Sequence, residues 1–282
     1  MRFSPKRLTV AALALPALLF IAAAFLAPLV NLGRLSFLEH LSGGVLGTRY
    51  TLANYGQFVS DPFYLQLTRD SIILAVQASL LALVLGYPIA LFLHRTTSRW
   101  RGLLTVLAIA PLFVSGVVRT FGWMVILDDA GLINGGLRWL GIIDQPLALI
   151  FNWTGVAIGL AEGLVPFVIL SLLAGFGRLD QNVEDAAATL GAGPVRRFLR
   201  VTLPLSLPGI LLALLISFVV SMSAYVSPYV LGGGRVFVLA TEIFGQTFEL
   251  NNWPLAAVLS LYMMAMLVLL TVAYKRVAAR YT

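Results

Sequence analysis

The 282-residue chain offers few side chains that could carry out chemistry. Its only lysines are Lys6 and Lys275, and neither follows a glycine-rich loop, so the sequence contains no Walker P-loop for ATP. The chain has no cysteine, and the histidines His40 and His94 fall on opposite sides of the topology derived below, so neither a metal site nor a cofactor is expected. HExxH and GxSxG patterns are also absent. We therefore expect no enzymatic activity, and any energy input must come from an ion gradient or a partner protein.

Polar side chains inside apolar stretches are the other candidates, because hydrocarbon excludes them unless they have a function. Ser217, Ser221, Tyr225 and Tyr229 recur every four residues and would share one face of a helix. One interpretation is that this stripe borders a wet passage for a solute. The alternative is structural, with the serines bonded back to their own helix and the tyrosines at the membrane interface.

A second polar face combines Ser115, Arg119 and Trp123. Arg119 either faces the same passage or extends outward to the headgroups. Counting 1.5 Å per residue along straight spans puts Arg119 and Glu162 near opposite faces of the bilayer, roughly 20 Å apart, so no direct salt bridge is expected. Glu162 is instead expected near an inner gate or at a subunit interface, with Pro166 one turn on as a kink.

Composition indicates a polytopic membrane protein, since 60% of the residues are apolar and only 11% are charged. Six charge-poor runs are long enough to cross a bilayer. They are residues 8–32, 71–93, 102–127, 145–177, 208–231 and 254–274. The first run imitates a secretory signal, but it is too long for one and is expected to be retained as a helix. The predicted fold is an all-α integral membrane protein with six transmembrane helices.

The loops give the orientation. The N-terminus, residues 95–101, residues 178–200 and the C-terminus contain most of the 19 lysines and arginines, so both termini are predicted to be cytoplasmic. The net charge of +7 therefore reflects topology and anionic lipid headgroups, and no nucleic-acid partner is expected. Short helices are predicted within residues 33–69, lying on the membrane surface, and after residue 127, capped by Asp128 or Asp129.

The longest charged segment runs from Val183 to Pro204 and should lie in the cytoplasm. Asp180 is predicted to cap a first helix. Along this helix Leu179, Val183 and Leu190 form an apolar stripe, with Ala186 or Ala187 between them. Glu184 and Asp185 lie beside the stripe and are expected to face water or a partner.

Gly191 is predicted to end the first helix, and Pro194 is suited to the first turn of a second one. In the second helix Phe198 and Leu199 share an apolar face, while Arg196 and Arg200 form another face. A solvated loop between two spans would explain the charges, but it would leave the apolar residues uncovered. We therefore predict a helix–turn–helix bracket that a partner covers.

This segment resembles the EAA loop of type I ABC importer permeases. The family pattern is Glu-Ala-Ala, three residues, Gly, nine residues, then Ile-x-Leu-Pro. The matching positions are Asp185, Ala186, Ala187, Gly191, Val201, Leu203 and Pro204, with Asp in place of Glu and Val in place of Ile. In the family this loop docks into a groove of the cytoplasmic ATPase. The resemblance implies a coupling role for Glu184, Asp185, Ala186, Ala187, Gly191, Arg196, Phe198, Leu203 and Pro204.

The resemblance covers nearly the whole chain. Segments such as YTLANY, PLFVSGVVRTFGWMVILDDAGLIN and LGGGRVFVLATEI look like the permeases of spermidine and putrescine importers and of relatives for opines, other amines and aminophosphonates. It implies the type I ABC importer permease fold in a bacterial inner membrane. It also implies a second similar permease, a pair of ATPase subunits and a periplasmic solute-binding protein as partners.

The expected organisation is an N-terminal helix and periplasmic loop (1–69), a transmembrane domain (70–275) with the coupling loop at about 179–204, and a cytoplasmic tail (276–282). The rival interpretation is a secondary transporter or channel driven by an ion gradient, which would not need an exposed bracket of this sequence.

Overall fold

The computed structural model describes residues 5–41, 44–179 and 181–278, and most of them are helical. The chain divides into two compact units. One contains the residues up to Pro62 together with Ile243–Met264, and the other contains Phe63–Glu242 and the residues from Ala265 onward. Asp180, predicted as a helix cap, and the last residues of the predicted tail, 279–282, lie outside the described residues.

The first unit joins a long apolar helix to a small hairpin. Its N-terminal elements are α1 (Pro5–Ser36), β1 (Leu38–Leu41), β2 (Val45–Tyr50) and α2 (Ala53–Ser60). The two strands pair antiparallel, with Leu41 opposite Val45. The amide of buried Asn54 donates to the carbonyls of Ser36 and Leu38 at 3.0 and 2.9 Å, which fixes α2 against the hairpin. The predicted short helix is thus present as α2, whereas the hairpin was not predicted.

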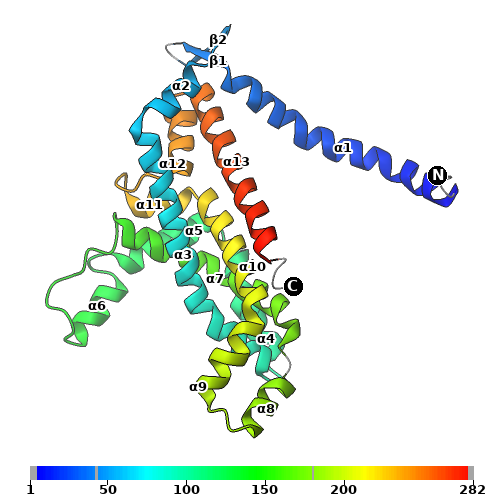
Figure 1. Cartoon of the computed structure of the whole chain (residues 1–282). Helices are drawn as coiled ribbons and strands as arrows, with labels where there is room; N and C mark the ends of the chain where they lie inside the picture. The colour runs from blue at the N-terminus through cyan, green and yellow to red at the C-terminus, as the bar shows by residue number, and fades with distance from the viewer. Residues whose placement is uncertain (1–4, 42–43, 180, 279–282) are drawn as a thin grey trace. The chain divides into compact units, whose positions relative to one another are not determined.

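The second unit is a helical bundle (Figure 1). Its elements are α3 (Pro62–Arg95), α4 (Arg101–Ile109), a 3-10 turn (Ala110–Phe113), α5 (Gly116–Leu127), α6 (Leu132–Trp139), α7 (Trp153–Gly175), a 3-10 turn (Phe176–Arg178), α8 (Gln181–Thr189), α9 (Pro194–Arg197), a π turn (Phe198–Thr202), α10 (Leu203–Ser223) and α11 (Val226–Gly232). Towards the C-terminus come α12 (Leu239–Phe244), a π turn (Gly245–Glu249) and α13 (Trp253–Ala278), of which residues 243–264 are assigned to the first unit and the rest to the second.

Five described helices are long and apolar enough to cross a membrane, and a bent pair raises the number to six if it forms one span. The bent pair replaces the straight third span predicted over residues 102–127. Here the chain leaves the helix after the 3-10 turn that contains Pro111, and Val114 and Ser115 are extended, with ψ of 134° and 130°. The two halves meet at 96°. The straight-helix prediction was wrong because two consecutive extended residues end a helix even where the sequence stays apolar.

The fifth span also differs from the prediction of one helix over residues 208–231. Helical backbone is continuous from Pro194 to Ser223, and Pro204 follows directly after the π turn at Phe198–Thr202, near the start of α10. The helix then stops at Ala224, which is extended with ψ of 124°, and α11 begins at Val226. Ser221 and Tyr229 therefore lie on different helices.

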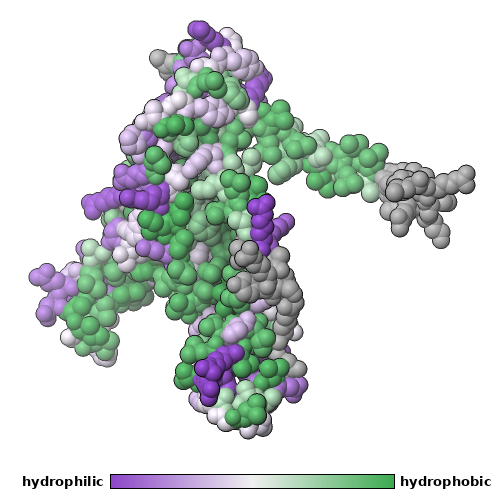
Figure 2. All heavy atoms as spheres, viewed as in Figure 1, coloured by the Kyte–Doolittle hydropathy of each residue, from purple (hydrophilic) through white to green (hydrophobic). Residues whose placement is uncertain are grey.

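The core of the second unit surrounds α7. Leu164, Val168 and Leu172 are buried there and pack in one apolar cluster with residues of α3 and α10. Gly175 and Gly209 bring the backbones of α7 and α10 together, since a β-carbon at Gly175 would collide with the Cα of Gly209. Close backbone approach at small residues is the usual way in which membrane helices pack. Figure 2 shows mainly apolar residues over the middle of this bundle and a mixture of hydrophilic and apolar residues near its lower end, where α8 and α9 lie.

Candidate functional site

The docking segment, which we define as residues 179–204, is built around Gly191. The φ angle of Gly191 is +80°, as expected for a glycine between two short helices. The N–H of Gly191 donates to the carbonyl of Ala188 at 2.9 Å, and the N–H of Ala192 donates to that of Ala187 at 3.0 Å. This pair of hydrogen bonds is the Schellman motif that closes a helix at a left-handed residue. Pro194 then opens α9, as predicted.

The outer surface of the docking segment is apolar. Val183 is 45% exposed, Leu190 88%, Val195 70% and Leu199 54%, and the carboxylate residue Asp185 is exposed beside them. Arg196 is also exposed, and Ala186 is exposed next to half-buried Ala187. Large apolar side chains on a loop between charged residues are suited to a protein partner rather than to water.

Glu184 was predicted to face water or a partner, but it bonds to residues of its own chain instead. Its Oε1 accepts a hydrogen bond from Thr202 Oγ1 and another from Arg95 NH2, both at 2.6 Å. Burial raises the pKa of the Glu184 carboxyl, but the hydrogen bonds from Thr202 and Arg95 together with the positive charge of Arg95 outweigh this effect, so its pKa lies below the usual value. The prediction failed because both partners are far from Glu184 in sequence.

Two further residues of the segment face inward. The ring of Phe198 makes an edge contact with Tyr87 at a centroid distance of 5.9 Å, so the chain itself covers the part of Phe198 that was expected to need a partner. Leu203 packs against the core of the second unit, while Pro204 is exposed in the first turn of α10. The apolar face available to a partner is therefore formed by Val183, Leu190, Val195 and Leu199.

A cavity of about 310 Å³ lies among α5, α7, α10 and α11. Arg119, Ser221 and Tyr225, which were predicted to border a passage, all line it, together with Thr120 and Ser227. Ser217 is buried away from the cavity, and its Oγ has no hydrogen-bond partner among the described residues. Tyr229 lies on α11 outside the lining and is 49% exposed. The tertiary structure thus gathers part of the predicted stripe and leaves the rest aside.

Arg119 and Glu162 form a direct ion pair, so the prediction that excluded it was wrong. Nε of Arg119 lies 3.1 Å from Oε2 of Glu162, and the indole N–H of Trp123 donates to the same oxygen at 3.1 Å. Arg119 NH1 donates to the carbonyl of Pro111 at 3.3 Å. Gly163 leaves room for the guanidinium, since a β-carbon there would lie 2.6 Å from Arg119 NH2. Depth counted along a straight helix misplaced Arg119, because the chain turns before α5.

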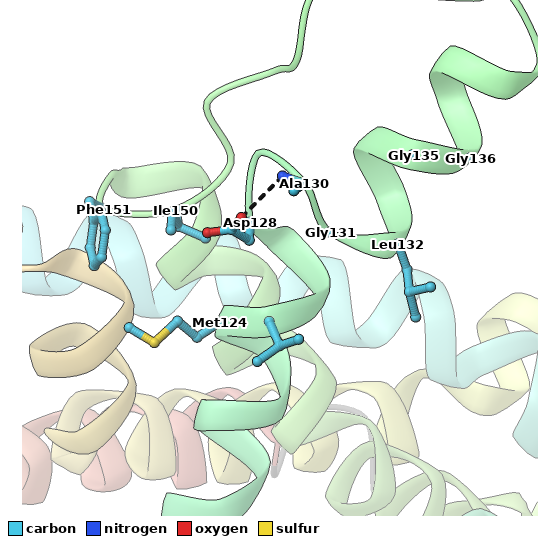
Figure 3. Close-up of a pocket in the computed structure, with 10 residues that line it drawn as sticks. Met124, Asp128, Ala130, Gly131, Leu132, Gly135, Gly136, Ile150 and Phe151 are labelled. Carbon is cyan, nitrogen blue, oxygen red and sulfur yellow. Dashed lines mark hydrogen bonds between the residues drawn. The ribbon is translucent and has the colours of Figure 1, made fainter.

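A second, larger pocket of about 640 Å³ lies between α5 and α6 (Figure 3). It was not predicted. Asp128 does not cap α6, whose preceding residue is Gly131; instead its Oδ1 accepts from the N–H of Ala130 at 3.0 Å, the bond drawn in Figure 3. Buried Asn134 holds the loop by bonding the carbonyls of Asp128 and Leu147 and the N–H of Leu147. The sequence signal for this pocket was Asn134, a polar residue beside two glycines in a mostly apolar helix.

Comparison with known proteins gives the class of this bundle. Residues 78–282 match the family described as "Binding-protein-dependent transport system inner membrane component". The chain is 32% identical over 252 residues to the spermidine/putrescine transport system permease protein PotB of Escherichia coli (strain K12), covering 89% of this chain and 91% of that protein. It is 29% identical over 241 residues to PotB of Haemophilus influenzae, covering 86% and 84%.

The fold has a counterpart among solved structures. A chain of a bacterial alginate ABC transporter, in complex with a pentasaccharide-bound periplasmic protein, matches with a TM-score of 0.73 at 17% identity, covering 98% of this chain and 95% of that one. At this identity the likeness concerns the fold alone. The protein is thus a multi-pass membrane permease. The chain belongs to the family of inner-membrane components of binding-protein-dependent ABC importers, and membership implies an ATPase and a solute-binding protein as partners.

Proposed function

We propose that this chain is the permease subunit through which an ATP-driven importer moves a polyamine or related amine across the bacterial inner membrane. The similarity to PotB, named for spermidine and putrescine transport, supports this substrate class. In the proposal a periplasmic binding protein delivers the solute, two ATPase subunits hydrolyse ATP, and a second homologous permease completes a heterodimer.

The docking segment carries the proposal. Leu190, Val195 and Leu199 project around the left-handed turn at Gly191, and such a surface fits a groove on an ATPase subunit. Asp185 and Arg196 lie exposed beside them and would form polar contacts at the rim. In this arrangement the segment and both termini lie in the cytoplasm, in agreement with the positive-inside rule.

The proposed translocation path passes the 310 Å³ cavity lined by Arg119, Ser221 and Tyr225. Glu162 pairs with Arg119, and Trp123 donates to the same Glu162 oxygen, so these two residues hold the Arg119 side chain in position at the cavity. Pairing with Glu162 neutralises the guanidinium, so an ammonium group would meet hydroxyls and a compensated charge rather than a bare cation. Ser217 and Tyr229 do not line this cavity, because Ser217 is buried away from it and Tyr229 is exposed on α11.

The test is reconstitution of the tagged chain with the proteins that co-purify with it from its own membranes. We expect an ATPase and a second permease among them, and uptake of labelled spermidine that needs ATP and survives an ionophore. Uptake that proceeds without the ATPase and stops with the ionophore would replace the proposal with a secondary transporter. ATP-dependent uptake of another solute, unaffected by excess spermidine or putrescine, would overturn the substrate class alone.

A further inference from the structure

Glu184 links three elements that are far apart in sequence. Arg95 is the last residue of α3, Glu184 lies in α8, and Thr202 ends the π turn that leads into α10. Glu184 Oε1 accepts from both Arg95 NH2 and Thr202 Oγ1, and Arg95 NH2 also donates to Thr202 Oγ1 at 3.3 Å. Thr202 is fully buried, and the Glu184 side chain is only 12% exposed. The three groups therefore form a closed triangle in which Glu184 and Thr202 are largely covered and the Arg95 side chain, 41% exposed, reaches the surface.

The end of α3 also holds the segment at other points. The ring nitrogen Nε2 of His94 lies 3.0 Å from the carbonyl oxygen of Leu179, where the segment begins. The hydroxyl of Tyr87 lies 2.9 Å from Ser206 Oγ, and the Tyr87 ring contacts Phe198. Helix α3 thus contacts the start and the end of the docking segment, while Glu184 is the contact made by α8 itself.

The covalent connection of α8 to α10 contains two glycines, Gly191 and Gly193. It runs through the turn at residues 190–193, where neither Gly191 nor Gly193 has a heavy atom within 4 Å of a β-carbon position. A displacement of α8 would be absorbed by bending this open turn unless side chains tie α8 to the bundle. Charge-assisted hydrogen bonds are short and directional, so the triangle can transmit such a displacement.

We propose that Glu184 is a positioning residue that latches α8 to α3 and α10, so that motion of the docked ATPase reaches the membrane helices. The inference rests on the proposed function for its role in coupling. It assigns Glu184 an inward role distinct from that of its neighbour Asp185, which is exposed and faces the ATPase. Glu184 is therefore needed for transmission and not for ATPase binding.

The first experiment separates binding from coupling in the reconstituted complex. Glu184→Ala should lower solute-stimulated ATP hydrolysis about tenfold, the size expected from losing hydrogen bonds to a charged group, while ATPase binding changes less than about twofold. Asp185→Ala should instead weaken ATPase binding. Arg95→Ala should behave as Glu184→Ala does, and Arg99→Ala, in the exposed loop that follows, should match the wild type. Full coupling in Glu184→Ala, or loss of ATPase binding equal to that of Asp185→Ala, would overturn the latch.

The second experiment needs no partner. A spin label on Leu190→Cys reports the mobility of the docking segment in the purified full-length chain, which has no native cysteine. Adding Glu184→Ala or Thr202→Val should mobilise the label, and combining them should mobilise it no further than the stronger single change, because both remove one network. An unchanged spectrum in both variants would exclude the latch whether or not an ATPase binds. If the variants mobilise the label as expected but the wild-type chain does not bind an ATPase, the result counts against the proposed function and not against the contact made by Glu184.

Discussion

Nε of Arg119 lies 3.1 Å from Oε2 of Glu162, although the two residues belong to different helices, α5 and α7. Trp123, one turn after Arg119, donates its indole N–H to the same carboxylate oxygen. Each side chain of the pair is about a quarter exposed, at 25% and 26%. A charge within an apolar bundle is costly unless a partner compensates it, so this pair is what allows Arg119 to border the cavity.

Breaking this pair should destabilise the protein. Arg119→Met or Glu162→Met alone leaves one charge without its partner and should lower the free energy of unfolding by about 2 kcal/mol, less than for a fully buried pair. The double change Arg119→Met/Glu162→Met should recover most of the loss. Thermal unfolding of the detergent-purified chain measures both effects. If the single variants unfold at the same temperature as the wild type, the ion pair does not contribute to stability.

Filling the cavity should block transport. Ser221→Trp adds a large side chain to the wall of the 310 Å³ cavity and should reduce uptake severalfold while assembly continues. Val272→Trp, on an exposed face of α13, is the matched control and should transport normally. Uptake in reconstituted vesicles, normalised to the amount of assembled complex, measures the effect. Normal transport by Ser221→Trp would make the polar stripe structural.

Variants of Gly191 and Gly193 test whether the left-handed conformation of the turn matters. Gly191 has a φ of +80° and Gly193 a φ of −64°, and both have open space where a β-carbon would lie. Gly191→Val should strain the turn by about 1 kcal/mol or more and misalign the docking segment, whereas Gly193→Ala should be tolerated.

Because the turn lies outside the spans, Gly191→Val should be made in normal amount. Its defect should appear as weak ATPase binding, or as hydrolysis that loaded binding protein no longer stimulates. Gly191→Asn should be milder, since asparagine tolerates this conformation better. A Gly191→Val protein that still couples uptake to hydrolysis would remove the docking assignment and reopen the secondary-transporter alternative.

The orientation can be tested by single-cysteine labelling, because the chain has no cysteine of its own. An impermeant thiol reagent applied to intact cells should leave Arg99→Cys and Arg196→Cys unlabelled and should label Asp144→Cys, which is exposed on the predicted outer side. Permeabilised cells provide the control for reactivity. Labelling at position 99 or 196 in intact cells would reverse the topology.

The contact of Glu184 with Arg95 and Thr202 should persist in mild acid. In the folded chain the hydrogen bonds from Thr202 and Arg95 hold the pKa of Glu184 below its unfolded value, so the stabilisation is present above the unfolded pKa and is lost as the pH falls through the folded one. A spin label at position 190 should therefore keep its mobility from pH 8 down to about pH 5 and loosen only below the ordinary carboxyl range. The Glu184→Gln variant should lack this transition, and a transition that persists in it would assign the effect to another group.

Local sequence determined the elements of the docking segment. The end of α8, the left-handed Gly191 and the start of α9 at Pro194 follow from interactions among residues a few positions apart, and the structure confirms them. The membrane class follows from composition, since apolar runs of this length cannot be solvated by water. The family pattern around Asp185 and Gly191 is also local, and so the kind of protein was recognisable without coordinates.

Only the tertiary structure decided where the separated side chains meet. The 96° bend before α5 and the stop at Ala224 interrupt runs that remain apolar throughout, because hydropathy reports solubility in lipid and not backbone direction. The bend brings Arg119 to Glu162, and packing brings Arg95 to Glu184 across 89 positions of sequence. Such pairs depend on how whole helices pack, and the free energy of that packing is shared among many contacts that no short stretch of sequence contains.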